Sequence, residues 1–141
     1  MPPRQASPLM RPISLQGSIA IFWLAAPLLI GCGPTNSTIH LHGHVTYDGQ
    51  PVPNGTIYFE PDTTAGNSGH GSVAIIRQGA FDTREALGVV GGPHLVRIEG
   101  YDGIAHGDNA DGQPLFPTFE TKAELPASSS SIDFDVPKKK K

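Results

Sequence analysis

The chain has 141 residues, the length expected of a single domain. Its formal charge is −3, yet the body after Cys32 and before the C-terminal lysines carries thirteen acidic side chains against four basic ones. An acidic body of this kind excludes a nucleic-acid surface. Because Cys32 is the only cysteine, an internal disulfide framework and a cysteine-based zinc site are excluded as well.

The N-terminal residues have the organisation of an export signal. Residues 1–16 carry Arg4 and Arg11 and no acidic residue, and residues 17–30 (GSIAIFWLAAPLLI) are almost wholly apolar. A basic segment, an apolar run and a small residue at the cleavage point describe a secretory signal peptide. A transmembrane helix needs about 20 apolar residues, whereas this run is shorter and contains Pro27. We therefore expect the segment to be cleaved.

The apolar run ends in Leu29-Ile30-Gly31-Cys32, which resembles the lipobox of bacterial lipoproteins. The resemblance implies cleavage before Cys32, a diacylglycerol thioether on its sulfur and acylation of the new amino group. Stable anchoring takes more than one acyl chain, and a triacylated cysteine supplies it. An aspartate directly after the lipobox cysteine would resemble an inner-membrane retention signal. This chain has Gly33 at that position, which favours the outer membrane. The expected organisation is a signal peptide over residues 1–31, a lipidated tether over 32–38, a β domain over 39–136 and a basic tail over 137–141.

The mature body alternates between apolar and polar residues, as half-buried strands do. Residues 39–47 (IHLHGHVTY) place Leu41, Gly43 and Val45 on one face and three histidines on the other. Asp48-Gly49 then favours a tight turn. Residues 62–71 and 101–118 are polar, glycine-rich and expected to be loops. Further strands are expected over residues 56–61, 72–83 (a hairpin turning at Gln78-Gly79), 89–100 (a Gly-Gly-Pro turn followed by a strand), 120–127 and 130–136.

About seven short strands with turn signals between them predict an all-β fold, an antiparallel β-sandwich. No amphipathic helix of ordinary length is recognisable in the mature part. The alternation also predicts the core, with these side chains pointing inward: Val45, Tyr47, Ile57, Phe59, Val73, Ile75, Phe81, Val96, Ile98, Leu125, Ile132 and Phe134.

The order of turns and core positions resembles a known family. Gly43-x-Val45, Asp48-Gly49-x-Pro51-Val52 and Asn54-Gly55-x-Ile57-x-Phe59 are similar to the start of carboxypeptidase regulatory-like, transthyretin-like domains. Residues 79–81 and 92–98 resemble later elements of the same family. The family usually has a Pro-Gly turn before the second of these, and this chain has Gly-Gly-Pro instead. The resemblance covers most of residues 41–136. It implies a transthyretin-like or Ig-like sandwich that serves as an accessory, non-catalytic surface or binding domain.

Three histidines on one strand face form the sharpest candidate for chemistry. Along the strand, each of His40, His42 and His44 would lie about 6.6–6.8 Å from the next. Two imidazoles with a third group can bind Zn²⁺ or Cu²⁺, and Asp133 or Asp135 could supply that group if the strands are neighbours. The alternative is a solvated strand face near the tether. The isolated His70, His94 and His106 are expected at the surface.

Other signatures are absent or incomplete. Residues 107–114 (GDNADGQP) superficially resemble a calcium loop, but an EF-hand alignment puts Gly107 at the first ligand position. Residues 66–70 lack the second glycine of G-x-S-x-G. The four lysines of the tail could attract anionic lipid or simply be solvated.

These features predict a non-enzymatic, lipid-anchored envelope protein. Its β domain is expected to act as a binding or structural module for an envelope protein or a polysaccharide. A metal-binding envelope protein that uses the histidine strand, and a small envelope enzyme, are the alternatives.

Overall fold

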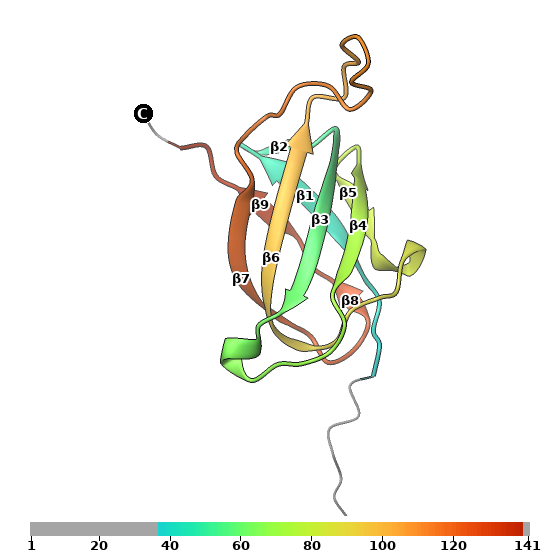
Figure 1. Ribbon diagram of the computed structural model, residues 1–141, viewed down its shortest axis with the longest axis vertical. Coiled ribbons are helices and arrows are strands. Elements are labelled where there is room, and N and C mark those ends of the chain that lie inside the picture. Colours follow the sequence, from blue (N-terminus) through green and yellow to red (C-terminus); the bar gives the residue numbers. More distant parts are fainter. Residues whose placement is uncertain (1–36, 140–141) are drawn as a thin grey trace, which may run out of the picture. The chain divides into compact units, whose positions relative to one another are not determined.

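A computed structural model describes residues 37–139 (Figure 1). The predicted signal peptide, Cys32 and the last two lysines lie outside the described residues. The described part contains nine strands, β1 (Leu41–Tyr47), β2 (Gln50–Pro51), β3 (Asn54–Pro61), β4 (Ser72–Arg77), β5 (Ala80–Asp82), β6 (Gly92–Tyr101), β7 (Phe119–Leu125), β8 (Ser130–Ser131) and β9 (Phe134–Val136), with 3₁₀ turns η1 (Thr63–Ala65) and η2 (Thr83–Glu85).

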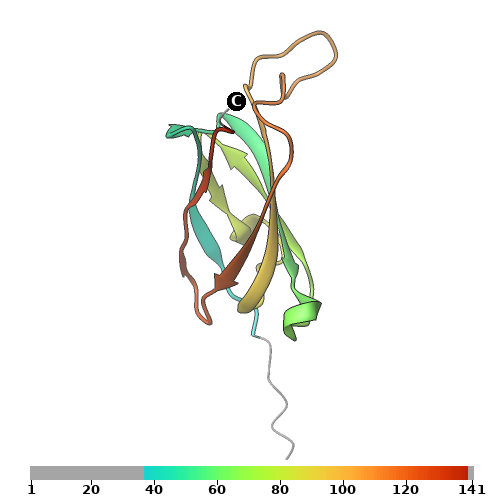
Figure 2. The same cartoon turned by 90° about the vertical axis from the view of Figure 1, so that its left-hand side faces the viewer.

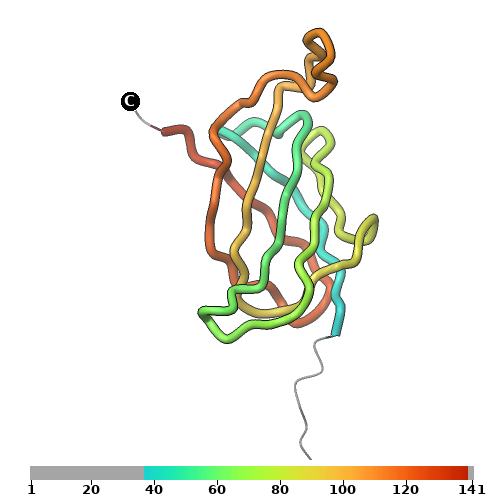
Figure 3. Tube along the Cα trace, in the orientation of Figure 1, coloured from blue at the N-terminus to red at the C-terminus, as the bar shows by residue number. Residues whose placement is uncertain are grey.

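The strands follow one hydrogen-bonded path that curls around the core (Figures 1 and 3). Their order is β2-β1-β5-β4-β3-β6-β7, with antiparallel pairing at every step. The prediction of an all-β fold with about seven strands is confirmed. Within residues 37–139 both helices are three-residue turns, so none has the length of a membrane-spanning helix.

The last two strands depart from the antiparallel pattern. Both β8 and β9 run parallel to β1, with Leu41 opposite Ser130 and Val45 opposite Phe134. Residues 132 and 133 interrupt the single strand expected over 130–136, although Ile132 still donates its N–H to the His42 carbonyl at 3.0 Å. The first strand of the domain is therefore flanked by β5 on one side and by the last strands on the other.

Most of the predicted core is buried where the curled sheet faces itself. Ile57, Phe59 and Ile98 are fully inaccessible to solvent, and Tyr47 and Ile132 pack against the buried residues from the periphery. Leu41, Val52, Val89 and Phe116 join the core without having been predicted.

On β4 the predicted inward face is wrong. Val73 and Ile75 are 40% and 42% exposed, while Ala74 and Ile76 are buried. The register of the hairpin is the cause. Gln78 and Gly79 both have positive φ, 51° and 82°, so they form the two-residue loop of a tight hairpin and Arg77 pairs with Ala80. The next pair of residues away from the turn is Ile76 and Phe81, and both therefore lie on the inner face.

This corrected register gives a matched test within one strand. Replacing Ile76 with alanine is expected to lower the free energy of unfolding by about 2–3 kcal/mol, because it empties a buried site. The same change at Ile75 is expected to cost under about 1 kcal/mol, because that side chain already faces solvent. Urea unfolding of the two variants measures both values. Equal losses would contradict the register.

A buried carboxylate fixes the loop after β3. Asp62 is 2% exposed and caps η1 by accepting the Thr64 N–H at 3.0 Å. Its other oxygen accepts a hydrogen bond from Lys122 Nζ of β7 at 2.9 Å. The hydrogen bond from the Thr64 hydroxyl and that from Lys122 lower the pKa of Asp62 from 3.8 to about 2.

Acid is expected to release this tie. Since the pKa of Asp62 is lower in the folded chain, its stabilisation is present above about pH 4 and disappears as the pH falls towards 2. Asp62→Asn should lower the urea midpoint at pH 5 and shrink the fall in that midpoint between pH 5 and pH 2.5. Asp108→Asn, in an exposed loop, is the control. A variant that keeps the wild-type acid profile would refute the assignment.

His94 is buried, contrary to its expected place at the surface. It is 1% exposed because β6 starts at Gly92, earlier than predicted, so His94 alternates inward with Val96 and Ile98. Its Nδ1 lies 3.0 Å from the Gly92 carbonyl oxygen. Its Nε2 is buried without a hydrogen-bond partner among the described residues.

Candidate functional site

The histidine face predicted on β1 is present. His42 and His44 are exposed and alternate with the buried Leu41, Gly43 and Val45. His40 differs, because it precedes the strand and is half-buried. Its N–H donates to Ser129 Oγ at 3.0 Å, and its Nδ1 is buried without a partner in the described part. The structure therefore leaves two of the three histidines side by side and accessible.

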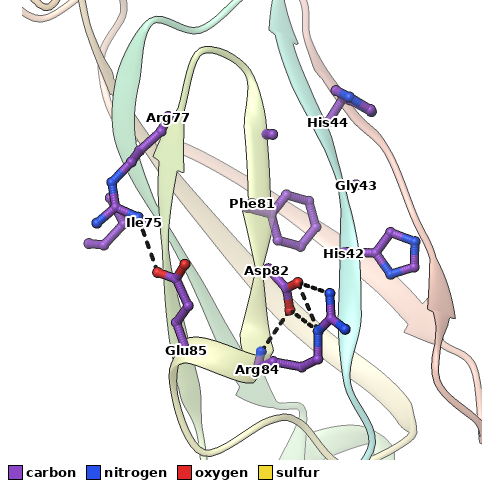
Figure 4. Close-up of a pocket in the computed structure, with 10 residues that line it drawn as sticks. His42, Gly43, His44, Ile75, Arg77, Phe81, Asp82, Arg84 and Glu85 are labelled. Carbon is purple, nitrogen blue, oxygen red and sulfur yellow. Dashed lines mark hydrogen bonds and ion pairs between the residues drawn. The ribbon is translucent and has the colours of Figure 1, made fainter.

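These two histidines border a shallow hollow of about 400 Å³ on the outer side of β1, β4 and β5 (Figure 4). The opposite wall comes from Ile75 and Arg77 of β4 and from Arg84 and Glu85 of η2. Figure 4 shows His42 and His44 projecting on one side of Phe81 and Arg77 on the other. The hollow thus combines two imidazoles with two of the three arginines of the acidic body.

Both arginines are engaged by carboxylates. The guanidinium of Arg84 donates through Nε to Asp82 Oδ2 at 2.9 Å, and the Arg84 N–H donates to Oδ1 at 2.8 Å. These bonds lower the pKa of Asp82 to about 2 and raise that of Arg84. On the wall opposite the histidines, Arg77 pairs with Glu85 at 3.1 Å. The charges of this hollow are therefore balanced in pairs.

A carboxylate lies beside each exposed histidine, but neither carboxylate is free. His42 is directly opposite Asp82, which Arg84 already binds. The Nδ1 of His44 lies 3.5 Å from Asp133 Oδ1, and that oxygen accepts the His44 N–H at 2.7 Å. Residues 37–139 contain no group of three His, Cys, Asp or Glu side chains placed to hold a metal ion. Binding of Zn²⁺ or Cu²⁺ through His40, His42 and His44 stays a prediction from sequence.

The acidic loop after β6 is occupied by its own turns. Asp102 accepts the N–H groups of Ile104 and Gln113 at 2.9 and 3.0 Å, which lowers its pKa. Asp111 accepts a hydrogen bond from Asn54 Nδ2 at 2.8 Å. These carboxylates organise the loop.

Arg77 and Arg84 were not predicted as site residues, although the turn at Gln78-Gly79 is a signal for Arg77. Once the two-residue turn at Gln78-Gly79 is taken to fix the register, Arg77 falls on the outer face of β4. The Asp82–Arg84 pair has the spacing of a side chain that caps its own turn.

No protein-family model matches the chain, and no curated protein matches it. The resemblance to carboxypeptidase regulatory-like domains rests on the turn and core residues quoted above.

Proposed function

We propose that this protein is a lipid-anchored protein of the bacterial cell envelope, whose β domain is a non-enzymatic binding or structural module. The observation that carries the proposal is the sequence Leu29-Ile30-Gly31-Cys32 directly after a basic segment and an apolar run. In that context the lone cysteine has a chemical role, the attachment of acyl chains.

The position of the fold along the chain supports this proposal. Ile39, near the start of the described residues, exchanges backbone hydrogen bonds with Val89 at 2.8 and 2.9 Å. The core is built from residues 39–136, all of which follow Cys32 in the sequence. Seven residue steps separate Cys32 from Ile39, and they span at most about 25 Å. An anchor at Cys32 would hold the domain that close to the lipid surface.

A transthyretin-like sandwich is the fold relationship we infer for this domain. Its support is the agreement between the family-like turn residues and their places in the structure. Asp48 and Gly49 have positive φ in the β1–β2 turn, and Gly43 and Gly55 are buried in strands. The partner we propose is an envelope protein or a polysaccharide, and Gly33 after the cysteine favours the outer membrane.

Cys32→Ser tests the anchor. In a double-membraned bacterium fed labelled palmitate, the wild-type chain should carry label and sediment with membranes. The serine variant should lose the label and stay uncut or become soluble, because serine has no thiol to alkylate. Asn36→Ser, within the same tether, is the matched control and should be labelled as the wild type is. A processed, membrane-bound Cys32→Ser product would refute lipidation at this residue.

A further inference from the structure

A second hollow lies where the curled sheet stays open. Among the described strands, β7 pairs with β6 alone and β9 pairs with β1 alone. Figure 2 shows these two strands diverging from the end where residues 126–130 connect them. A hollow of about 490 Å³ lies between the start of β7 and the end of β9. Its size falls within the range of about 300–1,000 Å³ that is typical of small-molecule sites.

Aromatic and proline side chains line this hollow, which we call the β7–β9 groove. Tyr47 and Phe116 pack with ring centroids 4.9 Å apart, and Phe119 and Pro137 lie beside them. Tyr47 and Phe119 are only partly buried. Apolar rings that face solvent in a concave site, on an otherwise acidic domain, are typical of a ligand pocket.

Backbone packing holds the floor of the groove in place. The ring of Phe116 lies against Gly100 so closely that a Cβ at Gly100 would be 2.6 Å from its Cζ. Phe116 itself is 8% exposed and belongs to the core. The ring therefore has no room to move inward, and it forms a fixed part of the floor of the groove.

The charges at the rim are unequal. Lys138 is paired with Asp48 at 2.7 Å. Glu120 also lines the groove. It alternates with Phe119, so its side chain points to the outer face of the sheet, where Arg97 is its partner in the strand register. Among residues 37–139, this leaves Lys139 as the rim cation without an ion-pair partner.

We propose that the β7–β9 groove binds a small amphiphilic carboxylate, with its apolar body on the aromatic rings and its acid group at Lys139. The ring-lined floor supplies apolar contact, and the unpaired ammonium supplies an opposite charge at the mouth.

The place of the groove favours a soluble ligand over a bilayer lipid, a step that rests on the proposed anchor. The described chain enters at one end of β1, and Tyr47 is the last residue of that strand. Figures 1 and 2 show the chain entering at the end of the sheet opposite to the start of β7. An anchor at Cys32 would therefore be attached at the end of the domain opposite to the groove.

Three probes of equal chain length test the proposal on residues 33–141, the compact unit that contains the whole core. They are octanoate, octanol and octylammonium, each titrated while the NMR signals of Tyr47 and Phe119 are followed. Octanoate is expected to bind with a dissociation constant of about 1 mM, octanol more weakly and octylammonium most weakly. Because residues 33–141 do not include Cys32, the result of this titration is independent of the anchor experiment.

Two variants separate the apolar and ionic parts of the site. Lys139→Gln is expected to weaken octanoate binding about threefold and to leave octanol binding unchanged, since only the charge is lost. Phe119→Ser should weaken the binding of both octanoate and octanol. Phe119→Leu keeps an apolar side chain and should preserve most of the binding, and it serves as the test if the serine variant fails to fold. Arg77→Gln removes a charge in the other hollow and should change neither.

Clear outcomes would overturn the proposal. Absence of octanoate binding by the folded protein would do so, as would equal binding of octanoate and octylammonium. Binding to vesicles rich in anionic lipid without binding to octanoate would make this end a membrane contact. A dimer in sedimentation that hides the signals of Tyr47 and Phe119 would make the groove an interface between copies.

Discussion

Gly43→Ala is expected to lower the free energy of unfolding by about 4 kcal/mol or more, in the range reserved for severe single substitutions. A Cβ at residue 43 would lie 1.9 Å from the carbonyl oxygen of Ile132. Since that atom is main chain, no side-chain rotation relieves the overlap. The strand β1 would have to separate from the chain between β8 and β9, and the bond from His44 N–H to Asp133 would weaken with it.

Urea unfolding of Gly43→Ala measures this effect, with Gly107→Ala as the matched control. Gly107 has φ +58°, and a Cβ there would meet no atom within 4 Å. The control therefore isolates the conformational cost of alanine at a left-handed position, about 1–2 kcal/mol. A loss at Gly43 no larger than that at Gly107 would mean that β1 and the β8–β9 segment do not approach as closely as described.

Phe59→Ala is the second substitution with a large expected effect, a loss of about 4 kcal/mol. Phe59 is fully buried, and its ring centroid lies 5.9 Å from that of Phe81 and 6.2 Å from that of Phe134. These rings come from β3, β5 and β9, so one side chain packs against rings from two other strands. Removing it leaves a cavity that three separate strands would have to close.

The matched control for Phe59→Ala is Leu87→Ala, because Leu87 is 71% exposed. That variant should unfold within about 0.5 kcal/mol of the wild type. Thermal melting of the three proteins gives the comparison. A Phe59→Ala melting temperature near that of the wild type would refute a core centred on the aromatic cluster.

Local patterns predicted most of the strands and their inner faces. In β1, β3 and β6 apolar and polar residues alternate, and Val45, Ile57, Phe59, Val96 and Ile98 are buried as predicted. β4 carries Val73, Ala74, Ile75 and Ile76 in succession, so alternation alone cannot say which pair faces the core. There the turn geometry decides, through the pairing of Arg77 with Ala80.

What the sequence could not provide is the set of long-range partners. The parallel pairing of β9 with β1 joins residues about ninety positions apart, and no local signal encodes it. The histidine face was predicted because it lies within one strand. The groove between β7 and β9 was not, because Tyr47, Phe116 and Phe119 come together only when the sheet curls. Lipidation and signal cleavage fall outside the described residues and stay predictions.

The pairing of the first strand with the last also has a consequence for the order of folding. Until residues 130–136 have been synthesised, one side of β1 has no partner, and its ladder with β9 cannot form. Contacts separated by so much chain make folding slow, because loop closure must precede them. A polypeptide threaded N-terminus first would thus remain unfinished throughout its passage. If the chain is exported as proposed above, the domain would complete itself only after passage, and the slow closing step would keep the chain competent for export.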